Sequence, residues 1–388
     1  MRASTLHVTS VLASAALAAA AGAQSYTVTN LGAIDAESAA FALTPSGAAA
    51  GFLANANHEF RATIWDGGAT ALIQPLAGDH HSVATAILDS STAAGQSYSL
   101  GAVSAHGFMS TGGLVTDLGD FVPRSVNASG ALAGAVNALE GPESVRRPAV
   151  RIAGSTFILP TLTSLGGQAL DLNDAGWVVG QAVNAQLQVR AVLWRNGQIS
   201  DLGTLGGPRA WAHAINGAGL VAGASETAAG DIHAALFTLS PTGQVLGRTD
   251  LGTLADRDST AFDVNARSQA VGVSNARAVM WRAGETIALD ERIQGQGRWR
   301  LELARAINDA GEIVGFGYEL GTPSAFLLTP CAGDANVDFL VNFADLNVLL
   351  SQFNDAVPPG SGADFTNDGQ VDFDDLNRLL SNFNTVCP

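Results

Sequence analysis

Two twelve-residue stretches near the carboxyl end carry the side chains best suited to chemistry. Each stretch places oxygen-bearing residues at its positions one, three, five, nine and twelve, and offers a main-chain carbonyl at position seven. The first stretch has Asp334, Asn336, Asp338, Leu340, Asn342 and Asp345, and the second, 30 residues later, has Asp364, Thr366, Asp368, Gln370, Asp372 and Asp375. A hard divalent cation with six to eight oxygen ligands requires donors at this spacing. The sequence therefore predicts two Ca²⁺ sites, one in each stretch.

The charge of this segment supports the same interpretation. Residues 331–388 contain nine aspartates, no glutamate and one arginine, a net charge of −8 and half of the −16 of the whole chain. Such acid density repels itself unless a cation binds. The alternative is a solvated acidic tail, but Val341 and Val371 at loop position eight favour a folded module. An apolar helical pattern follows each loop, at 346–350 and 376–380.

The two loops are not equivalent. Phe339 stands at position six of the first loop, where a glycine normally makes the sharp turn, and a positive φ at a bulky residue costs about 1 to 2 kcal/mol. We expect the first loop to bind calcium more weakly than the more typical second loop, although the neutral Thr366 partly offsets this ranking. Cys331 and Cys387 bracket the segment, and an exported protein would join them in a disulfide. Two free thiols are the alternative.

The duplicated loops, the aspartate at position twelve and the single helix after each loop resemble a type I dockerin over about residues 333–383. This resemblance implies that residues 331–388 form a small α-helical domain that binds two calcium ions and docks onto a cohesin domain. Dockerins place much of their recognition at loop positions ten and eleven, which here hold Phe343-Ala344 and Phe373-Asp374. These pairs depart from the small hydroxylated pairs of dockerins. The resemblance as a whole implies a cohesin-like protein or a cell-surface component as the partner.

A repeated unit fills most of the remaining chain. One glycine per unit serves as a ruler, at Gly51, Gly95, Gly134, Gly180, Gly223, Gly272 and Gly315, with spacings of 44, 39, 46, 43, 49 and 43 residues. The clearest copy, residues 169–203, has four short strand-like pieces separated by turn formers such as 173–176 and Asn196-Gly197. Four strands per unit and this period predict the blades of a β-propeller.

The two ends of the repeat region predict how the ring closes. The seventh unit supplies only three strands, at 306–308, 313–317 and 325–328, whereas residues 26–32 match the fourth-strand pattern of 199–203. An N-terminal strand that completes the last blade would remove the exposed edges of an open array. We therefore expect a mainly β fold, with residues 24–330 forming a seven-bladed β-propeller closed by its N-terminal strand.

The repeat residues also resemble a known family. The segments 201–207 and 250–254, the pair His233-Ala234 and the Ile-Asn-x-x-Gly turns are similar to the HAF repeats of bacterial extracellular proteins, over about residues 26–330. This family implies no general activity. We expect two further repeated positions to be scaffolding. They are the third-strand donors Arg61, Arg190, His233 and Arg277, which can satisfy loop carbonyls, and the aromatic residues Trp65, Trp194, Phe237 and Trp281, which can pack between blades.

The N-terminus and the composition indicate export. Arg2, an apolar run from Val8 to Ala21 and the small-residue site 21–23 predict a cleaved signal peptide over residues 1–23. No other segment reaches 18 continuous apolar residues, so we expect a secreted, extracellular or cell-surface protein with no transmembrane anchor. All 19 basic residues are arginines against 35 acidic ones, which argues against a nucleic-acid partner.

No catalytic motif stands out. The sequence lacks a Gly-x-Ser-x-Gly elbow, a phosphate loop and a His-Glu-x-x-His helix. We expect a non-enzymatic binding or scaffold protein, whose propeller presents a recognition face, for instance to an extracellular glycan, and whose calcium-stabilised tail attaches it to a partner. The competing hypothesis is a dockerin-bearing carbohydrate-active enzyme with a polysaccharide in the central channel. Carboxylates and exposed aromatics at one channel mouth would favour the enzyme, and a lining of alanine, valine and backbone would favour the binder.

Overall fold

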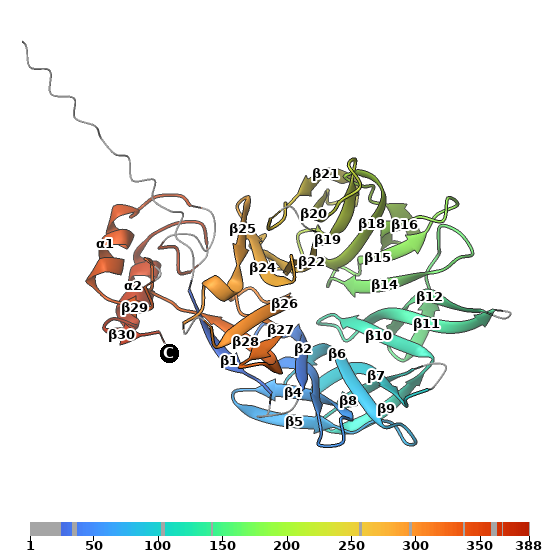
Figure 1. The fold of residues 1–388 in the computed structure, drawn as a ribbon. Coiled ribbons are helices and arrows are strands. Elements are labelled where there is room, and N and C mark those ends of the chain that lie inside the picture. The colour runs from blue at the N-terminus through green and yellow to red at the C-terminus, as the bar shows by residue number, and fades with distance from the viewer. Residues whose placement is uncertain are drawn as a thin grey trace, which may run out of the picture.

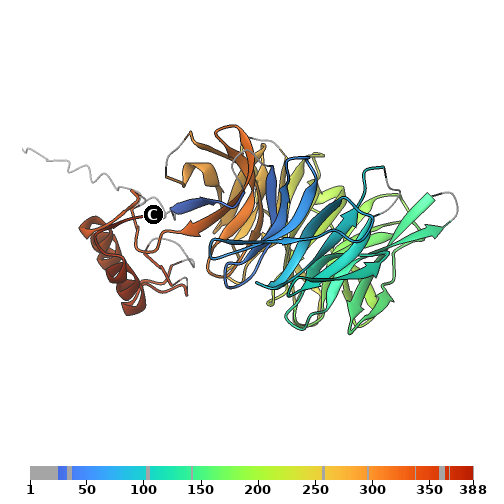
Figure 2. The same ribbon diagram turned by 90° about the horizontal axis from the view of Figure 1, so that it is seen from below.

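A ring of β-sheets with a smaller C-terminal module at its rim makes up this protein (Figure 1). The computed structural model describes residues 25–387 apart from 33–36, 102–104, 141–142, 256–257, 295–296, 337, 358–362 and 367, and apart from the side chains of 138–140 and 143–145. The expected signal peptide, 1–23, lies outside the described residues. Seen from the side, the ring is a disc (Figure 2). No described helix is long and apolar enough to cross a bilayer.

Six blades each consist of four consecutive antiparallel strands. The first blade contains β2 (Ser38–Leu43), β3 (Ala49–Ala54), β4 (Phe60–Asp66) and β5 (Ala69–Ile73). The second contains β6 (His81–Asp89), β7 (Thr92–Tyr98), β8 (His106–Thr111) and β9 (Leu114–Gly119). The third contains β10 (Phe121–Val126), β11 (Leu132–Glu140), β12 (Glu143–Ile152) and β13 (Ser155–Ile158).

The next three blades repeat this order. The fourth blade contains β14 (Gly167–Leu172), β15 (Val178–Val183), β16 (Val189–Arg195) and β17 (Gln198–Asp201). The fifth contains β18 (Gly206–Ile215), β19 (Leu220–Thr227), β20 (Ile232–Leu239) and β21 (Val245–Asp250). The sixth contains β22 (Ser259–Val264), β23 (Ala270–Ser274), β24 (Arg277–Arg282) and β25 (Glu285–Ala288), which runs into a 3₁₀ turn, η1 (Leu289–Glu291).

The seventh blade joins the two ends of the propeller. Its sheet has the order β1–β28–β27–β26, where β1 (Tyr26–Asn30) comes from the N-terminus, and β26 (Trp299–Ile307), β27 (Ile313–Glu319) and β28 (Thr322–Pro330) come from the end of the repeats. The β1–β28 register runs from Tyr26 opposite Pro330 to Asn30 opposite Phe326. The prediction of a seven-bladed propeller is confirmed, and the N-terminal strand closes the ring.

The innermost strand of every blade carries a β-bulge, and this bulge explains the recurring glycine. In the fifth blade Ala212 pairs with Gly223, and the register then skips His213 before Ala214 pairs again. A Cβ atom on Gly223 would lie 1.9 Å from the carbonyl oxygen of Trp211. Only glycine therefore lets the second strand pair closely beside the bulge.

The turn asparagines form a belt between neighbouring blades. Each asparagine Nδ2 donates to the main-chain carbonyl of the residue at the same position in the next blade. The links run from Asn127 to Asn173 (3.2 Å), to Asn216 (3.2 Å), to Asn265 (2.9 Å), to Asn308 (3.1 Å) and to Thr44 (3.1 Å). Each Oδ1 accepts the amide four residues further on, which holds its own turn. The Ile-Asn-x-x-Gly motif thus fixes both the turn and the blade-to-blade contact.

The core of the propeller lies between the blades. The repeated aromatics Trp65, Trp194, Phe237 and Trp281 are 3, 1, 0 and 2% exposed. They belong to apolar clusters that join residues of adjacent sheets. The expectation that these aromatics pack between blades is confirmed, and it leaves none of the four available to stack on a ligand.

The C-terminal module contains two halves that repeat the same order of loop and helix. In its described residues the helices α1 (Phe343–Ser351) and α2 (Phe373–Ser381) each follow one acidic loop, and the short strands β29 (Leu340–Val341) and β30 (Thr385–Val386) pair. Cys331 and Cys387 form a disulfide with their Cα atoms 5.8 Å apart. Its core contains Val341, Leu349, Val371 and Leu379, all at most 1% exposed. The helices thus follow the loops as the apolar pattern predicts.

Candidate functional site

The first acidic loop brings its carboxylates together. One oxygen each of Asp334, Asp338 and Asp345 lies within 4.8 Å of the other two. Asp345 is fully buried, because its Oδ1 accepts the amides of Ala335 and Asn336 and its Oδ2 accepts the amide of Asn342. These hydrogen bonds tie position twelve of the loop back to positions two, three and nine. The first helix therefore begins at the point where the loop closes.

The other three predicted ligands of this loop are Asn336, Leu340 and Asn342. Asn336 accepts the amide of Asp338 through Oδ1 and donates to its carboxylate at 3.0 Å. Asn342 caps α1 by accepting the amide of Ala344. Leu340 lies in β29, so its main-chain carbonyl, rather than its exposed side chain, is the donor available at position seven.

The second loop repeats these hydrogen bonds. Asp364 accepts the amides of Asp368 and Gly369, as Asp334 does from the corresponding residues. Asp375 is fully buried and accepts the amides of Thr366 and Asp372. Asp368 accepts the amide of Gln370, and Asp372 caps α2 through the amide of Asp374. Among the described residues, however, the close three-carboxylate group is found only in the first loop.

Phe339 adopts the left-handed conformation that its loop position demands. Its φ is +66°, and that of its counterpart Gly369 is +87°. The main-chain carbonyl of Phe339 accepts the amide of Cys387, and its ring packs against the core of the module. The packing and the nearby disulfide hold a backbone that costs about 1 to 2 kcal/mol for a non-glycine residue.

The buried acids of this module fit a hard cation. Asp334 and Asp345 are 3% and 0% exposed, and neither forms a salt bridge with a described basic side chain. Burial raises the pKa of Asp334, and the neighbouring Asp345 raises it further. Two close, buried carboxylates without a counter-charge are unfavourable unless a cation sits between them. Cys331 and Cys387, which also approach Asp334, are joined in the disulfide and are no metal ligands.

The propeller contacts both acidic loops. Ser25, directly before β1, donates its hydroxyl to Asp334 Oδ2 at 2.5 Å, and its carbonyl accepts the amide of Cys331. Arg267 donates to the carbonyl of Thr366 at 3.3 Å. Arg267 belongs to the segment 267–269 that departs from the repeat turn in the sixth unit, so this departure coincides with a contact to the tail.

The repeated third-strand donors act as scaffolding. Arg61 donates to the carbonyl of His80, and Arg190 donates to the carbonyl of Pro208, as expected for loop carbonyls. His233 pairs with the carboxylate of Asp250 at 2.8 Å, and Arg277 pairs with Asp290 and Glu291. The four side chains thus hold segments of their own blade or, as with Arg61 and Arg190, the start of the next one.

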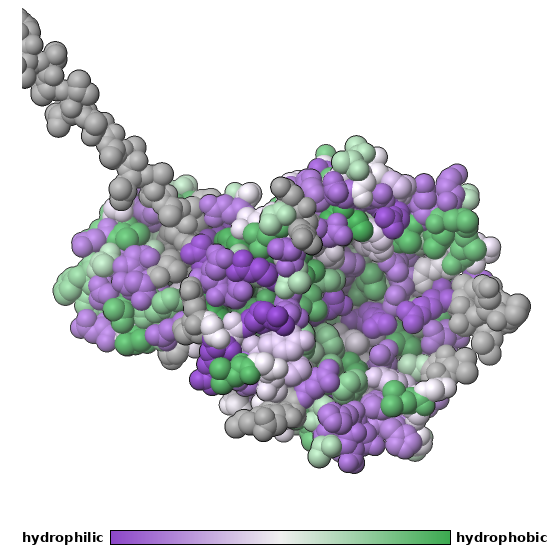
Figure 3. Space-filling model, in the orientation of Figure 1, coloured by the Kyte–Doolittle hydropathy of each residue, from purple (hydrophilic) through white to green (hydrophobic). Residues whose placement is uncertain are grey.

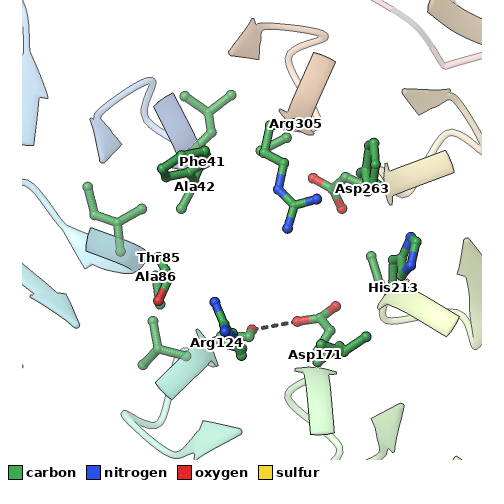
Figure 4. Close-up of a pocket in the computed structure, with 17 residues that line it drawn as sticks. Phe41, Ala42, Thr85, Ala86, Arg124, Asp171, His213, Asp263 and Arg305 are labelled. Atoms are coloured by element: carbon green, nitrogen blue, oxygen red, sulfur yellow. Dashed lines mark hydrogen bonds between the residues drawn. The ribbon is translucent and has the colours of Figure 1, made fainter. Parts of the chain in front are cut away.

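The central channel contains a second candidate site, which the sequence analysis missed. The seven bulged residues, one from each blade, line two cavities of about 190 and 440 Å³ that share this ring. They are Phe41, Thr85, Arg124, Leu170, His213, Phe262 and Arg305. Figure 4 labels Phe41, Thr85, Arg124, His213 and Arg305 around the open middle of the propeller, and Figure 3 shows a hollow there on the outer surface. We call this ring the channel waist.

Two carboxylates lie beside the channel waist. Asp171 accepts the hydroxyl of Ser125 from the preceding blade and the amide of Ile215 from the following one, and Asp263 accepts the amide of Ile307 (Figure 4). Burial raises the pKa of Asp171 to about 6 and that of Asp263 to about 7. The channel is therefore not lined by alanine, valine and backbone alone, and its carboxylates join neighbouring blades.

Comparisons with known proteins find similarity at the level of whole structures only. No protein-family model and no curated protein matches this chain. TolB from Acinetobacter baumannii is 12% identical with a TM-score of 0.43, over 74% of this chain and 64% of TolB. YCF48 bound to D1 peptide is 11% identical with a TM-score of 0.45, over 79% and 95%. A puromycin-hydrolyzing peptidase of Mycobacterium tuberculosis is 11% identical with a TM-score of 0.45, over 80% of this chain and 55% of the peptidase. This chain therefore spans less than two thirds of the length of TolB and of the peptidase.

Proposed function

We propose that this protein is a secreted, non-enzymatic binding or scaffold protein. The propeller presents a recognition face, and the C-terminal module folds around calcium and attaches the protein to a protein partner or a cell surface. A ring of blades gathers its connecting loops on two faces, which suits a propeller to the display of binding residues. The disulfide between Cys331 and Cys387 agrees with an oxidising extracellular environment.

Two calcium ions would complete the C-terminal module. The first would be held by Asp334, Asn336, Asp338, Asn342, Asp345 and the carbonyl of Leu340, and the second by Asp364, Thr366, Asp368, Asp372, Asp375 and the carbonyl of Gln370. Calcium would supply the positive charge that the buried carboxylates lack and so fix the start of each helix. The tail would then act as a calcium-dependent module of the kind that the dockerin resemblance implies.

The observation that carries the attachment role is a pair of exposed apolar side chains repeated in both halves of the module. Phe343 and Phe373 stand at loop position ten and are each 69% exposed, although each ring edge touches a phenylalanine of the other half. Leu350 and Leu380, about two turns further along the helices, are 55% and 51% exposed. Exposed aromatic and aliphatic groups on a rigid helix pair favour docking of a folded protein with an apolar recess.

A carbohydrate-active enzyme remains a second candidate because Asp171 and Asp263 lie in the channel with aromatic neighbours. Their raised pKa values would suit acid–base chemistry. Both carboxylates, however, accept main-chain amides of adjacent blades, which is a scaffolding role. Release of reducing sugar from a polysaccharide by the wild type, abolished in Asp263→Asn, would establish the enzyme instead.

The attachment role is tested with the full mature chain and an immobilised type I cohesin domain. We expect binding in 1 mM calcium that disappears in excess chelator and weakens at least tenfold in the double variant Phe343→Ala, Phe373→Ala. The variant Leu187→Ala, which removes a 75% exposed side chain from the propeller, is the matched control and should bind normally. Binding that survives chelation, or no binding in calcium, would contradict the proposal.

A further inference from the structure

The channel waist contains two arginines, Arg124 and Arg305, that form no salt bridge within the described residues, and the buried Nε of Arg124 has no hydrogen-bond partner there. Burial lowers the pKa of Arg124 to about 10, and the charges of Arg146 and Arg305 lower it further. Burial lowers the pKa of Arg305, and the nearby carboxylate of Asp263 partly offsets this. Asp263 is thus a partial counter-charge for Arg305, whereas no described carboxylate pairs with Arg124, and a buried guanidinium without such a partner is unfavourable unless an anion binds.

The side chains of His213, Phe262 and Arg305, from three successive blades, pack against one another. The ring of His213 stacks on the ring of Phe262, with the ring centroids 5.1 Å apart and an interplanar angle of 14°. The guanidinium carbon of Arg305 lies 4.6 Å from the centroid of the same Phe262 ring. This cation–π contact fixes the position of the guanidinium through its face, and the N–H groups of a guanidinium can still donate in its plane. In Figure 4 Arg305 reaches from β26 toward the open middle of the ring.

His213 adds an acceptor to the same wall. Its Nδ1 lies 2.9 Å from the carbonyl of Ala261, so Nδ1 carries the proton and donates it, which leaves Nε2 as an acceptor. Burial lowers the pKa of His213 to about 4, so the ring is neutral at pH 7. The waist therefore offers two cationic donors and one neutral acceptor, and the hydroxyl oxygen of Thr85, which donates its proton to the carbonyl of Pro123, is a second acceptor.

We propose that the channel waist binds a small hydroxylated organic carboxylate, with its carboxylate held by Arg124 and Arg305. This inference rests on the proposed role of the propeller as the recognition part of the protein and names the chemical class of its ligand. Phe41 and Phe262 provide apolar walls for an organic body, and His213 can accept a hydrogen bond from a ligand hydroxyl. The larger cavity, about 440 Å³, lies within the usual range for small-molecule sites.

A carboxylate fits this site better than a phosphate does. Asp171 and Asp263 lie in the same lining, and the negative charge that they carry when ionised would oppose a second negative charge on the ligand. A single carboxylate can accept a bidentate pair of hydrogen bonds from one guanidinium. Because each of its oxygens has two lone pairs, it can also accept from the second guanidinium. The aromatic walls add contact area that inorganic phosphate could not use.

Isothermal titration calorimetry of the full mature chain tests this proposal at constant ionic strength. The probes are D-glucuronate, D-galacturonate and D-gluconate, with D-glucose as the neutral control and inorganic phosphate as the inorganic anion. We expect at least one of the three carboxylates to bind with a Kd below 10 mM, and glucose and phosphate to bind at least tenfold more weakly. Absence of heat with all three carboxylates would overturn the proposal, and equally tight phosphate binding would overturn the assignment to carboxylates.

Two variants locate the binding to the waist. Arg124→Gln should weaken the carboxylate at least tenfold, and Arg124→Lys, which keeps the charge but loses the planar fork, should weaken it less. Arg298→Gln removes an arginine that is paired with Glu319 outside the waist, and it should bind as the wild type does. Unchanged affinity in a folded Arg124→Gln would overturn the proposal. Because none of these changes touches the acidic loops, a failure here leaves the cohesin test of the tail unaffected.

Discussion

Replacing Asn216 with alanine would break the asparagine belt at one link. The Asn216 side chain donates to the carbonyl of Asn265 at 2.9 Å and accepts the amides of Ala218 and Leu220, each at 3.0 Å. Asn216 is only 9% exposed, so water cannot readily replace these contacts. Leaving a buried donor or acceptor without its partner costs about 1 to 3 kcal/mol. We therefore expect Asn216→Ala to lower the free energy of unfolding by about 3 kcal/mol.

Differential scanning calorimetry measures this loss directly. At about 2.1 cal/mol/K per residue, a propeller spanning residues 26–330 has an unfolding entropy of ~0.6 kcal/mol/K, so 3 kcal/mol corresponds to about 5 °C in Tm. Asn216→Thr keeps an acceptor for the turn, as Thr44 does for the amide of Ala48 in the first blade, and should lose about half as much. Equal Tm values for wild type and both variants, within 1 °C, would refute the belt as a source of stability.

Three further changes test other parts of the structure. Tyr26 is 1% exposed, and its hydroxyl donates a weak hydrogen bond to the sulfur of Met280 at 3.7 Å. Tyr26→Ala should therefore cost about 3 to 5 kcal/mol in urea unfolding, whereas Tyr26→Phe should cost under about 1 kcal/mol. Burial raises the pKa of Asp263 to about 7, so the folded state holds this proton more tightly than the unfolded chain. The free energy of unfolding of the wild type should therefore fall by up to about 4 kcal/mol between pH 4 and pH 7 relative to that of Asp263→Asn. Thermal melts in which Tm changes with pH equally in both proteins would contradict this. Ser25→Ala removes the hydroxyl that donates to Asp334, and it should weaken calcium in the first loop about fivefold in a titration while the second loop binds unchanged.

The repeat glycines made the propeller predictable from sequence. Each glycine is required because the second strand passes directly beside the bulge of the first, as at Gly223 against the carbonyl of Trp211. A backbone requirement of this kind leaves the same residue type at the same interval, whatever the other side chains are. The turn asparagines recur for a similar reason, because each one satisfies its own turn and the next blade.

The channel waist was not predictable by the same method. The bulged residue of each blade faces the channel and is not paired across the strand, so its type is weakly restricted, and the seven positions hold five different residue types. A search for recurring residues passes over such a position. The signal that could have found it is positional: in each unit the bulged residue lies ten residues before the ruler glycine, as Arg124 lies before Gly134 and Arg305 before Gly315.

The acidic loops could be recognised because their donors follow a local spacing. The left-handed Phe339 was likewise predictable, since the loop geometry fixes the backbone at position six. The contacts of Ser25 with Asp334 and of Arg267 with Thr366 were not, because they join segments separated by 309 and 99 residues. Such contacts depend on how the completed propeller presents its rim to the tail.

Calcium binding to the full mature chain tests the central claim most directly. Calorimetric titration of the chelator-treated protein should show two bound ions per chain, and Asp345→Asn and Asp375→Asn should each remove one of them. The wild type with calcium should also melt at a higher temperature than the chelated protein, because ions that bind only the folded module stabilise it. No heat at millimolar calcium, together with an unchanged melting temperature, would contradict the account.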